Sequence, residues 1–123
     1  MTAQINKIDL LRELSLFTGT LTYTKLYPNV VLTDGTCFLA SAVGCYWLFD
    51  LFYSHLALHG DYEKFAYLNL RVSNHSALVE ITDGNKKVLA RQKIEYTDFP
   101  LDSISIFACQ DGAYWVMMLP SEY

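Results

Sequence analysis

The segment from Thr36 to Gly60 limits how this chain can fold more than any other. It reads TCFLASAVGCYWLFDLFYSHLALHG, and its one acidic or basic residue is Asp50. A helix that crosses a membrane needs about 20 consecutive apolar residues, whereas the uncharged run here ends at Phe49. A carboxylate at the centre of a bilayer costs about 2.5 to 3.5 kcal/mol. We therefore expect a helix buried inside a globular protein and not in a membrane.

Arranged on one long helix, this segment has two apolar faces. The narrower stripe is expected to lie buried against a sheet, and it contains Phe38, Ala42, Cys45, Phe49, Phe52 and Leu56. A second band includes Gly44, Trp47 and Leu51, and we expect it to mediate self-association, most simply as a homodimer. Gly44 disfavours helix, so it indicates either the close approach of a neighbouring backbone or a break in the helix. Thr33 or Asp34 is the expected N-cap.

The remaining segments predict a short helix and a series of strands. The helix is expected over residues 4–15, and a first strand over 20–27 ends at the turn formed by Pro28 and Asn29. Alternation with a period of two predicts five further strands at 64–73, 77–82, 88–96, 103–108 and 114–120. Their short connections predict antiparallel pairing of consecutive strands. Residues 1–123 should thus form a single two-layer α+β domain, an antiparallel β-meander of five to six strands on one long apolar helix plus a short N-terminal helix.

Few side-chain combinations in the sequence are suited to catalysis or metal binding. His55 and His59 have the spacing of two metal ligands on a helix, yet no third ligand follows on that helix. Cys45 and His55 are too far apart along one helix to form a nucleophile pair, and Cys109 with His75 would need adjacent strands. We expect free buried thiols, with no metal and no cofactor.

Acidic and aromatic residues are concentrated in the last thirty residues. From Ile94 to Tyr123 there are five carboxylates and no Lys or Arg. We expect this region to bind a partner, with carboxylates that steer a basic surface and aromatic rings that anchor it. The candidate partner-binding residues are Asp98, Phe99, Asp102, Asp111, Glu122 and Tyr123. A solvated acidic edge is the simpler alternative, and Asp98 and Asp102 could equally cap their own turn.

Charge and the amino terminus restrict the class of partner. The formal net charge of −4 argues against direct binding to nucleic acid or to an anionic membrane, because both require clustered cations. The first residues show no basic segment followed by a long apolar run, so no signal peptide is predicted and a cytoplasmic location is expected. A partner that is charged is therefore expected to present a basic surface.

Several short motifs are shared with proteins of one family. They are FTGT at 17–20, TDG at 33–35, YWLFD at 46–50, YTDFPLD at 96–102 and the terminal LPSEY. With them the chain resembles an uncharacterised family of proteins of about 120 residues from phages, plasmids and other bacterial mobile elements. The resemblance implies a mobile-element context, in which small acidic proteins often inhibit host defence systems, including CRISPR effectors.

Together these features predict a non-enzymatic inhibitor or adaptor that binds a host protein through an acidic aromatic surface, as an anti-CRISPR protein does. A small-molecule binding module with a pocket between helix and sheet is the alternative, and a cryptic hydrolase is less expected. A closed core with a flat acidic aromatic surface favours the first function. A deep pocket with convergent polar groups favours the other two.

Overall fold

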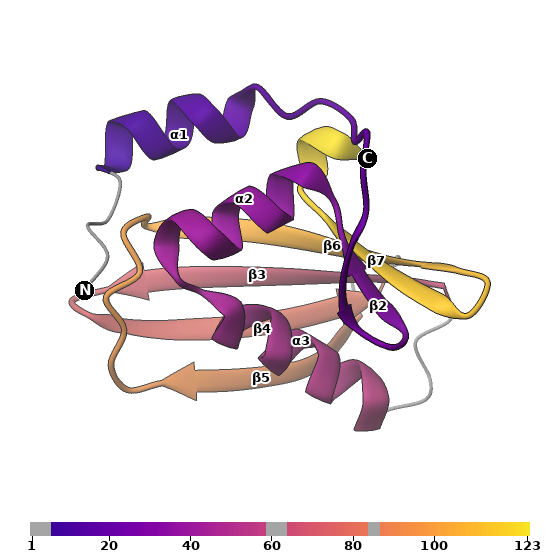
Figure 1. Ribbon diagram of the computed structural model, residues 1–123. Coiled ribbons are helices and arrows are strands. Elements are labelled where there is room, and N and C mark those ends of the chain that lie inside the picture. Colours follow the sequence, from indigo (N-terminus) through magenta and orange to yellow (C-terminus); the bar gives the residue numbers. More distant parts are fainter. Residues whose placement is uncertain (1–5, 59–63, 84–86) are drawn as a thin grey trace.

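The computed structural model describes residues 6–58, 64–83 and 87–123 (Figure 1). Its helices are α1 (Lys7–Ser15), α2 (Asp34–Val43) and α3 (Tyr46–Leu58), with a 3₁₀ turn, η1 (Pro120–Glu122), near the C-terminus. The strands are β1 (Thr24–Tyr27), β2 (Val30–Leu32), β3 (Phe65–Ser73), β4 (Ser76–Asp83), β5 (Val88–Ile94), β6 (Ser103–Asp111) and β7 (Tyr114–Met118). The predicted α+β class is confirmed.

The strands form one seven-stranded sheet in the order β1-β2-β7-β6-β3-β4-β5. Neighbouring strands are antiparallel except β2 and β7, which run parallel. The prediction of about five to six antiparallel strands is therefore only roughly matched, because the sheet has one more strand and one of its pairs is parallel. The strand that the sequence pattern did not predict is β2. It has only three residues, which are too few to show a period of two. In Figure 1, α2 and α3 lie on one side of the sheet, and α1 lies above β6.

The predicted meander is also wrong at one connection. β5 follows β4 as expected, but β6 returns to the far side of β3, so β6-β3-β4-β5 form a Greek key. Residues 95–102 cross the ends of β4 and β3 to make this return. Two backbone hydrogen bonds hold them there, from Thr97 N–H to the His75 carbonyl at 2.7 Å and from Val72 N–H to the Asp102 carbonyl at 2.8 Å.

The long apolar segment forms two helices separated at Gly44, which corrects the prediction of one long helix. Gly44 is the C-cap of α2 with a φ of 72°, in the left-handed region that glycine favours. A Cβ added there would have no heavy atom within 4 Å. Glycine is thus required here for the backbone conformation at the helix break, and not to allow the close approach of another backbone. Across the described ranges, no helix has both the length and the apolarity that a membrane crossing needs.

The core lies between the helices and the sheet face that they cover. Phe49, Phe52, Cys45 and Leu56 are buried in it, as predicted. Phe38 departs from the prediction, because it is only half-buried and packs against Phe17 at the edge, with ring centroids 5.5 Å apart. From the sheet, the core receives every second residue of the central strands, chiefly Leu68, Leu70, Val79, Ile81 and Ile106.

Candidate binding surface

The predicted acidic surface is divided between the two ends of the sheet. Asp98 and Asp102 lie in the connection from β5 to β6, beside the turn that joins β3 to β4. Asp111 is the last residue of β6 and pairs with Tyr114 at the opposite end of that strand. All three carboxylates are exposed. They cannot contact one small partner surface together, so the connection and the hairpin turn are separate candidate sites.

The Glu122 carboxylate is hydrogen-bonded within the chain, so it does not belong to the free acidic surface. One of its carboxylate oxygens accepts hydrogen bonds from the Thr33 hydroxyl at 2.6 Å and from Leu119 N–H at 3.0 Å. The other oxygen accepts from Gly35 N–H at 2.9 Å. Thr33 is the N-cap of α2 and Gly35 lies in its first turn, so the carboxylate stabilises the positive end of the helix dipole. The assignment of Glu122 as a partner-binding residue is therefore wrong, because both of its carboxylate oxygens accept hydrogen bonds within the chain.

The two predicted aromatic anchors lie in different environments. Phe99 is only 5% exposed and belongs to the core, so burial contradicts its assignment as an anchor. Tyr123 is 75% exposed and meets the rings of Phe65 and Phe107 edge to face, with centroids 5.9 and 5.5 Å apart. Because β-strand side chains alternate, Phe65 and Phe107 lie on the sheet face away from the core. Tyr123 is therefore exposed enough to contact a partner, but it does not lie beside Asp98.

The connection from β5 to β6 contributes to a pocket of about 270 Å³ that contains both an acid and aromatic rings. Its lining residues are Trp47 from α3, Ile94 from the end of β5, and Tyr96, Thr97 and Asp98 from the connection. Tyr96 is 72% exposed, and its ring stacks on His75 at 5.8 Å. The pocket thus joins Asp98, predicted to bind a partner, to Trp47, predicted to mediate self-association.

Asp98 and Asp102 differ in their electrostatic partners. The Asp102 carboxylate accepts a hydrogen bond from the Lys7 ammonium at 3.0 Å, in an exposed ion pair. Among the described residues, no Lys or Arg forms an ion pair with Asp98. The Phe99 N–H donates to the Thr97 hydroxyl at 3.2 Å, so Thr97 holds the turn there. Of these two carboxylates, Asp98 is consequently the better placed to meet a cation from outside.

Among the residues that the structure describes, the groups considered for catalysis are not assembled into a site. Burial raises the pKa of the Cys45 thiol to about 12, which leaves it protonated at neutral pH and a poor nucleophile. Cys109 lies opposite Phe65 at the start of β3, whereas His75 follows the far end of that strand. His59 is outside the described residues, so the predicted His55 and His59 pair is not placed. Within the described ranges, no three His, Cys, Asp or Glu side chains gather as metal ligands would.

Of the other predicted self-association residues, Gly44 precedes α3 and Leu51 lies on it. Gly44 is exposed between α2 and α3, and Leu51 is half-buried one turn beyond Trp47. A dimer through Gly44, Trp47 and Leu51 stays a prediction. The pocket residues Tyr96 and Thr97 were not singled out from the sequence. The six-residue length of the predicted connection, 97–102, was the available signal, because a tight hairpin needs only two to five residues.

Comparisons with known proteins give a family and a fold. A family model described as "Family of unknown function (DUF6876)" matches residues 8–123. A crystal structure of a protein of unknown function from Enterococcus faecalis is similar, with a TM-score of 0.53 and 19% sequence identity over 77% of this chain and 90% of that chain. At this identity the likeness concerns the fold alone. No curated protein matches the chain.

Proposed function

The chain belongs to the DUF6876 family of unknown function, and we propose that it is a non-enzymatic binding protein that captures a basic side chain of a partner protein. The pocket between Trp47 and Asp98 is the proposed point of contact. The partner is a host protein with a basic surface in the cytoplasm, such as a nucleic-acid-binding component of a CRISPR complex. The protein acts there as an inhibitor or adaptor from a mobile element, which is the context that its shared motifs imply.

The composition of the pocket supports this proposal. A carboxylate beside two aromatic rings is the arrangement that an arginine or lysine side chain fits, because the acid pairs with the charge and the rings attract the cation through their faces. The rings of Trp47 and Tyr96 supply the apolar wall, and Asp98 supplies the charge. A cation–π contact contributes about 0.5 to 1 kcal/mol at an exposed site. Affinity therefore requires several such contacts or a larger surface around this one.

The surroundings of the pocket favour a basic partner over an acidic one. The connection from 95 to 102 contains Glu95, Asp98 and Asp102 and no Lys or Arg. Exposed carboxylates of this kind steer a positively charged partner and raise its association rate. Asp102 is exposed even though it pairs with Lys7, and an exposed ion pair of this type is weak enough to exchange. A partner arginine can thus replace Lys7 at Asp102 while a neighbouring cation occupies the pocket.

A capture experiment tests the proposal. The tagged protein is used to isolate host proteins from a cell extract, and quantitative mass spectrometry compares the wild type with Asp98→Asn and Trp47→Ala. We expect a partner with a basic surface that is retained by the wild type and lost from both variants. Glu13→Gln, a neutralised exposed acid on α1, is the matched control and should retain it. Equal recovery with all four proteins would contradict the proposal.

A second copy of the chain is the competing occupant of the Trp47 pocket. Light scattering at tens of micromolar separates the two cases. If the wild type is a dimer and Trp47→Ala is a monomer, the pocket serves self-association and not a host protein. A monomeric wild type that still retains its partner supports the proposal.

A further inference from the structure

The half of β6 nearest its N-terminus has an unpaired edge. β3 pairs with β6 along Ser103 to Cys109 on one side, whereas β7 pairs with β6 only from Phe107 to Asp111 on the other. After Met118 the chain leaves the sheet and forms η1. Among the described residues, no strand therefore pairs with residues 103–106 on the β7 side. A lane for one further strand is left vacant in direct continuation of β7.

Backbone hydrogen-bonding groups point into this lane. In antiparallel pairs, alternate residues direct both N–H and C=O toward the same neighbouring strand. The bonds from Val72 N–H to the Asp102 carbonyl and from Gln110 N–H to the Lys64 carbonyl assign the even-numbered residues of β6 to the β3 side. Ser103 and Ser105 accordingly direct their backbone groups to the opposite side, where β7 is absent. The edge offers two N–H donors and two carbonyl acceptors to an added strand.

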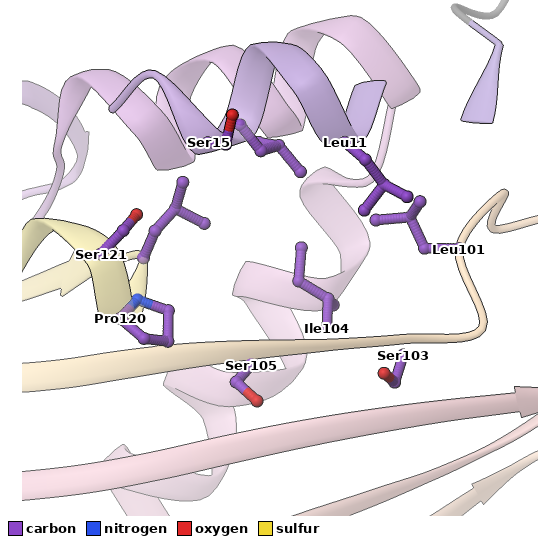
Figure 2. Close-up of a pocket in the computed structure, with 10 residues that line it drawn as sticks. Leu11, Ser15, Leu101, Ser103, Ile104, Ser105, Pro120 and Ser121 are labelled. Carbon is purple, nitrogen blue, oxygen red and sulfur yellow. The ribbon is translucent and has the colours of Figure 1, made fainter. Parts of the chain in front are cut away.

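An uncharged apolar groove runs beside this edge. It has a volume of about 390 Å³ and lies between α1, β6 and η1. Figure 2 shows Leu11 on α1 and Ile104 on β6 on the same side of the strand, Pro120 at one end of the groove and Leu101 at the other. None of the lining residues carries a formal charge. Leu11 is 49% exposed although it is a large apolar side chain on a helix.

We propose that this groove binds an extended, apolar peptide segment of another protein, which adds to the free edge of β6 as a strand. This site is distinct from the pocket at Trp47 and goes beyond the proposed function. The unpaired N–H and C=O groups of Ser103 and Ser105 select an extended backbone, because only a strand meets both with the correct spacing. The uncharged wall selects apolar side chains and disfavours phosphate or nucleic acid, which require cations.

The length of the unpaired edge determines how many peptide residues can pair with it. Residues 103–106 span about 13 Å at about 3.3 Å per residue, so about four residues of the peptide pair with the edge. Its side chains alternate, and those on the α1 side enter the groove between Leu11 and Ile104. A bulky aliphatic residue is expected there, with any residue at the next position. Because α1 walls the lane on one side and Pro120 closes one end (Figure 2), a single strand fits better than the edge of a folded domain.

A peptide selection tests this inference. Phage-displayed random nonapeptides are selected on the full chain, and the most enriched peptide is synthesised with a fluorescent label for affinity measurement. Ser103→Pro removes one edge-facing donor at the first residue of β6, where proline is tolerated, and Ser103→Ala keeps that donor. Leu11→Asp places a charge in the groove, whereas Ile8→Asp places one on the same helix, at a 70% exposed residue that does not line it.

We expect enriched peptides with aliphatic residues at alternate positions. Binding should weaken at least tenfold in Ser103→Pro and in Leu11→Asp, and change less than twofold in Ser103→Ala, Ile8→Asp and Asp98→Asn. The Asp98 variant separates this site from the pocket at Trp47. No enrichment, or equal binding to all variants, would overturn the inference. A dimer in light scattering that Ser103→Pro dissociates would also overturn it, because a second copy would then occupy the edge.

Discussion

The carboxylate of Glu122 accepts a hydrogen bond from the backbone N–H of Gly35 at 2.9 Å. This bond joins the last turn of the chain to the first turn of α2, and the Thr33 hydroxyl reinforces it at 2.6 Å. The TDG and LPSEY motifs, which are almost ninety residues apart, thus form one structural unit. The Glu122 carboxylate supplies negative charge at the positive end of the α2 dipole, and these hydrogen bonds hold η1 beside the first turn of α2.

Gly35→Ala is expected to destabilise the fold. A Cβ at position 35 would lie 2.5 Å from the nearer Glu122 carboxylate oxygen and 2.6 Å from a Leu119 methyl. Overpacking of this kind costs about 1 to 3 kcal/mol of unfolding free energy. Urea denaturation measures the change. Gly19→Ala is the matched control, since nothing lies within 4 Å of the added Cβ there, and equal stability of the two variants would contradict the Glu122 contact.

Phe49→Ala and Phe52→Ala should each lower the unfolding free energy by about 3 to 5 kcal/mol. Both rings are fully buried between α3 and the sheet, so truncation removes apolar contacts and leaves a cavity. Thermal denaturation followed by circular dichroism detects the loss. Tyr46→Ala, on the same helix but 43% exposed, should change the midpoint far less. A wild-type melting temperature for either Phe variant would remove these residues from the core.

The break between α2 and α3 predicts a specific pattern at position 44. Gly44→Ala should cost about 1 to 2 kcal/mol, because Gly44 has a φ of 72° and a Cβ disfavours that region. Gly44→Asn should cost less, since asparagine tolerates the left-handed conformation. The added side chains meet no neighbour, which separates backbone strain from packing. If alanine proved more stable than asparagine in chemical denaturation, a continuous helix would be the better description.

Burial of Cys45 predicts a pH dependence of stability. Its pKa is raised to about 12 by desolvation, from an ordinary value of 9.0. The folded chain therefore keeps the thiol proton to higher pH than the unfolded chain. The resulting stabilisation is complete below about pH 9 and is lost as the pH rises towards about 12. Cys45→Ala should show a shallower decline of unfolding free energy over that interval in urea titrations, and identical slopes would place the thiol in water.

Sequence patterns predicted local elements better than their pairing. The five strands of the second half and the short first helix follow from periodicities of two and 3.6 that the printed residues show directly. The parallel pairing of β2 with β7 joins residues 30–32 to residues 115–117, and no local pattern encodes so distant a contact. The same holds for β6, whose return to β3 depends on how residues 95–102 lie across the sheet end.

The candidate site was predictable in its parts only. Asp98 and Trp47 were both selected from the sequence, but for two different surfaces, because their proximity depends on the packing of α3 against the end of β5. Phe99 and Glu122 were selected for charge or aromatic character alone. Burial of Phe99 and the hydrogen bonds of Glu122 arise from tertiary contacts, which composition does not reveal.

The central claim is that the Trp47 and Asp98 pocket takes a cationic side chain. A nuclear magnetic resonance titration of ¹⁵N-labelled protein tests it most directly, with an arginine-containing hexapeptide and its citrulline counterpart, which has nearly the same shape without the charge. We predict that the Trp47 indole signal and the Thr97 and Asp98 amide signals shift with the arginine peptide and not with citrulline, and that Asp98→Asn abolishes the shifts. Equal shifts with both peptides, or shifts confined to other residues, would contradict the claim.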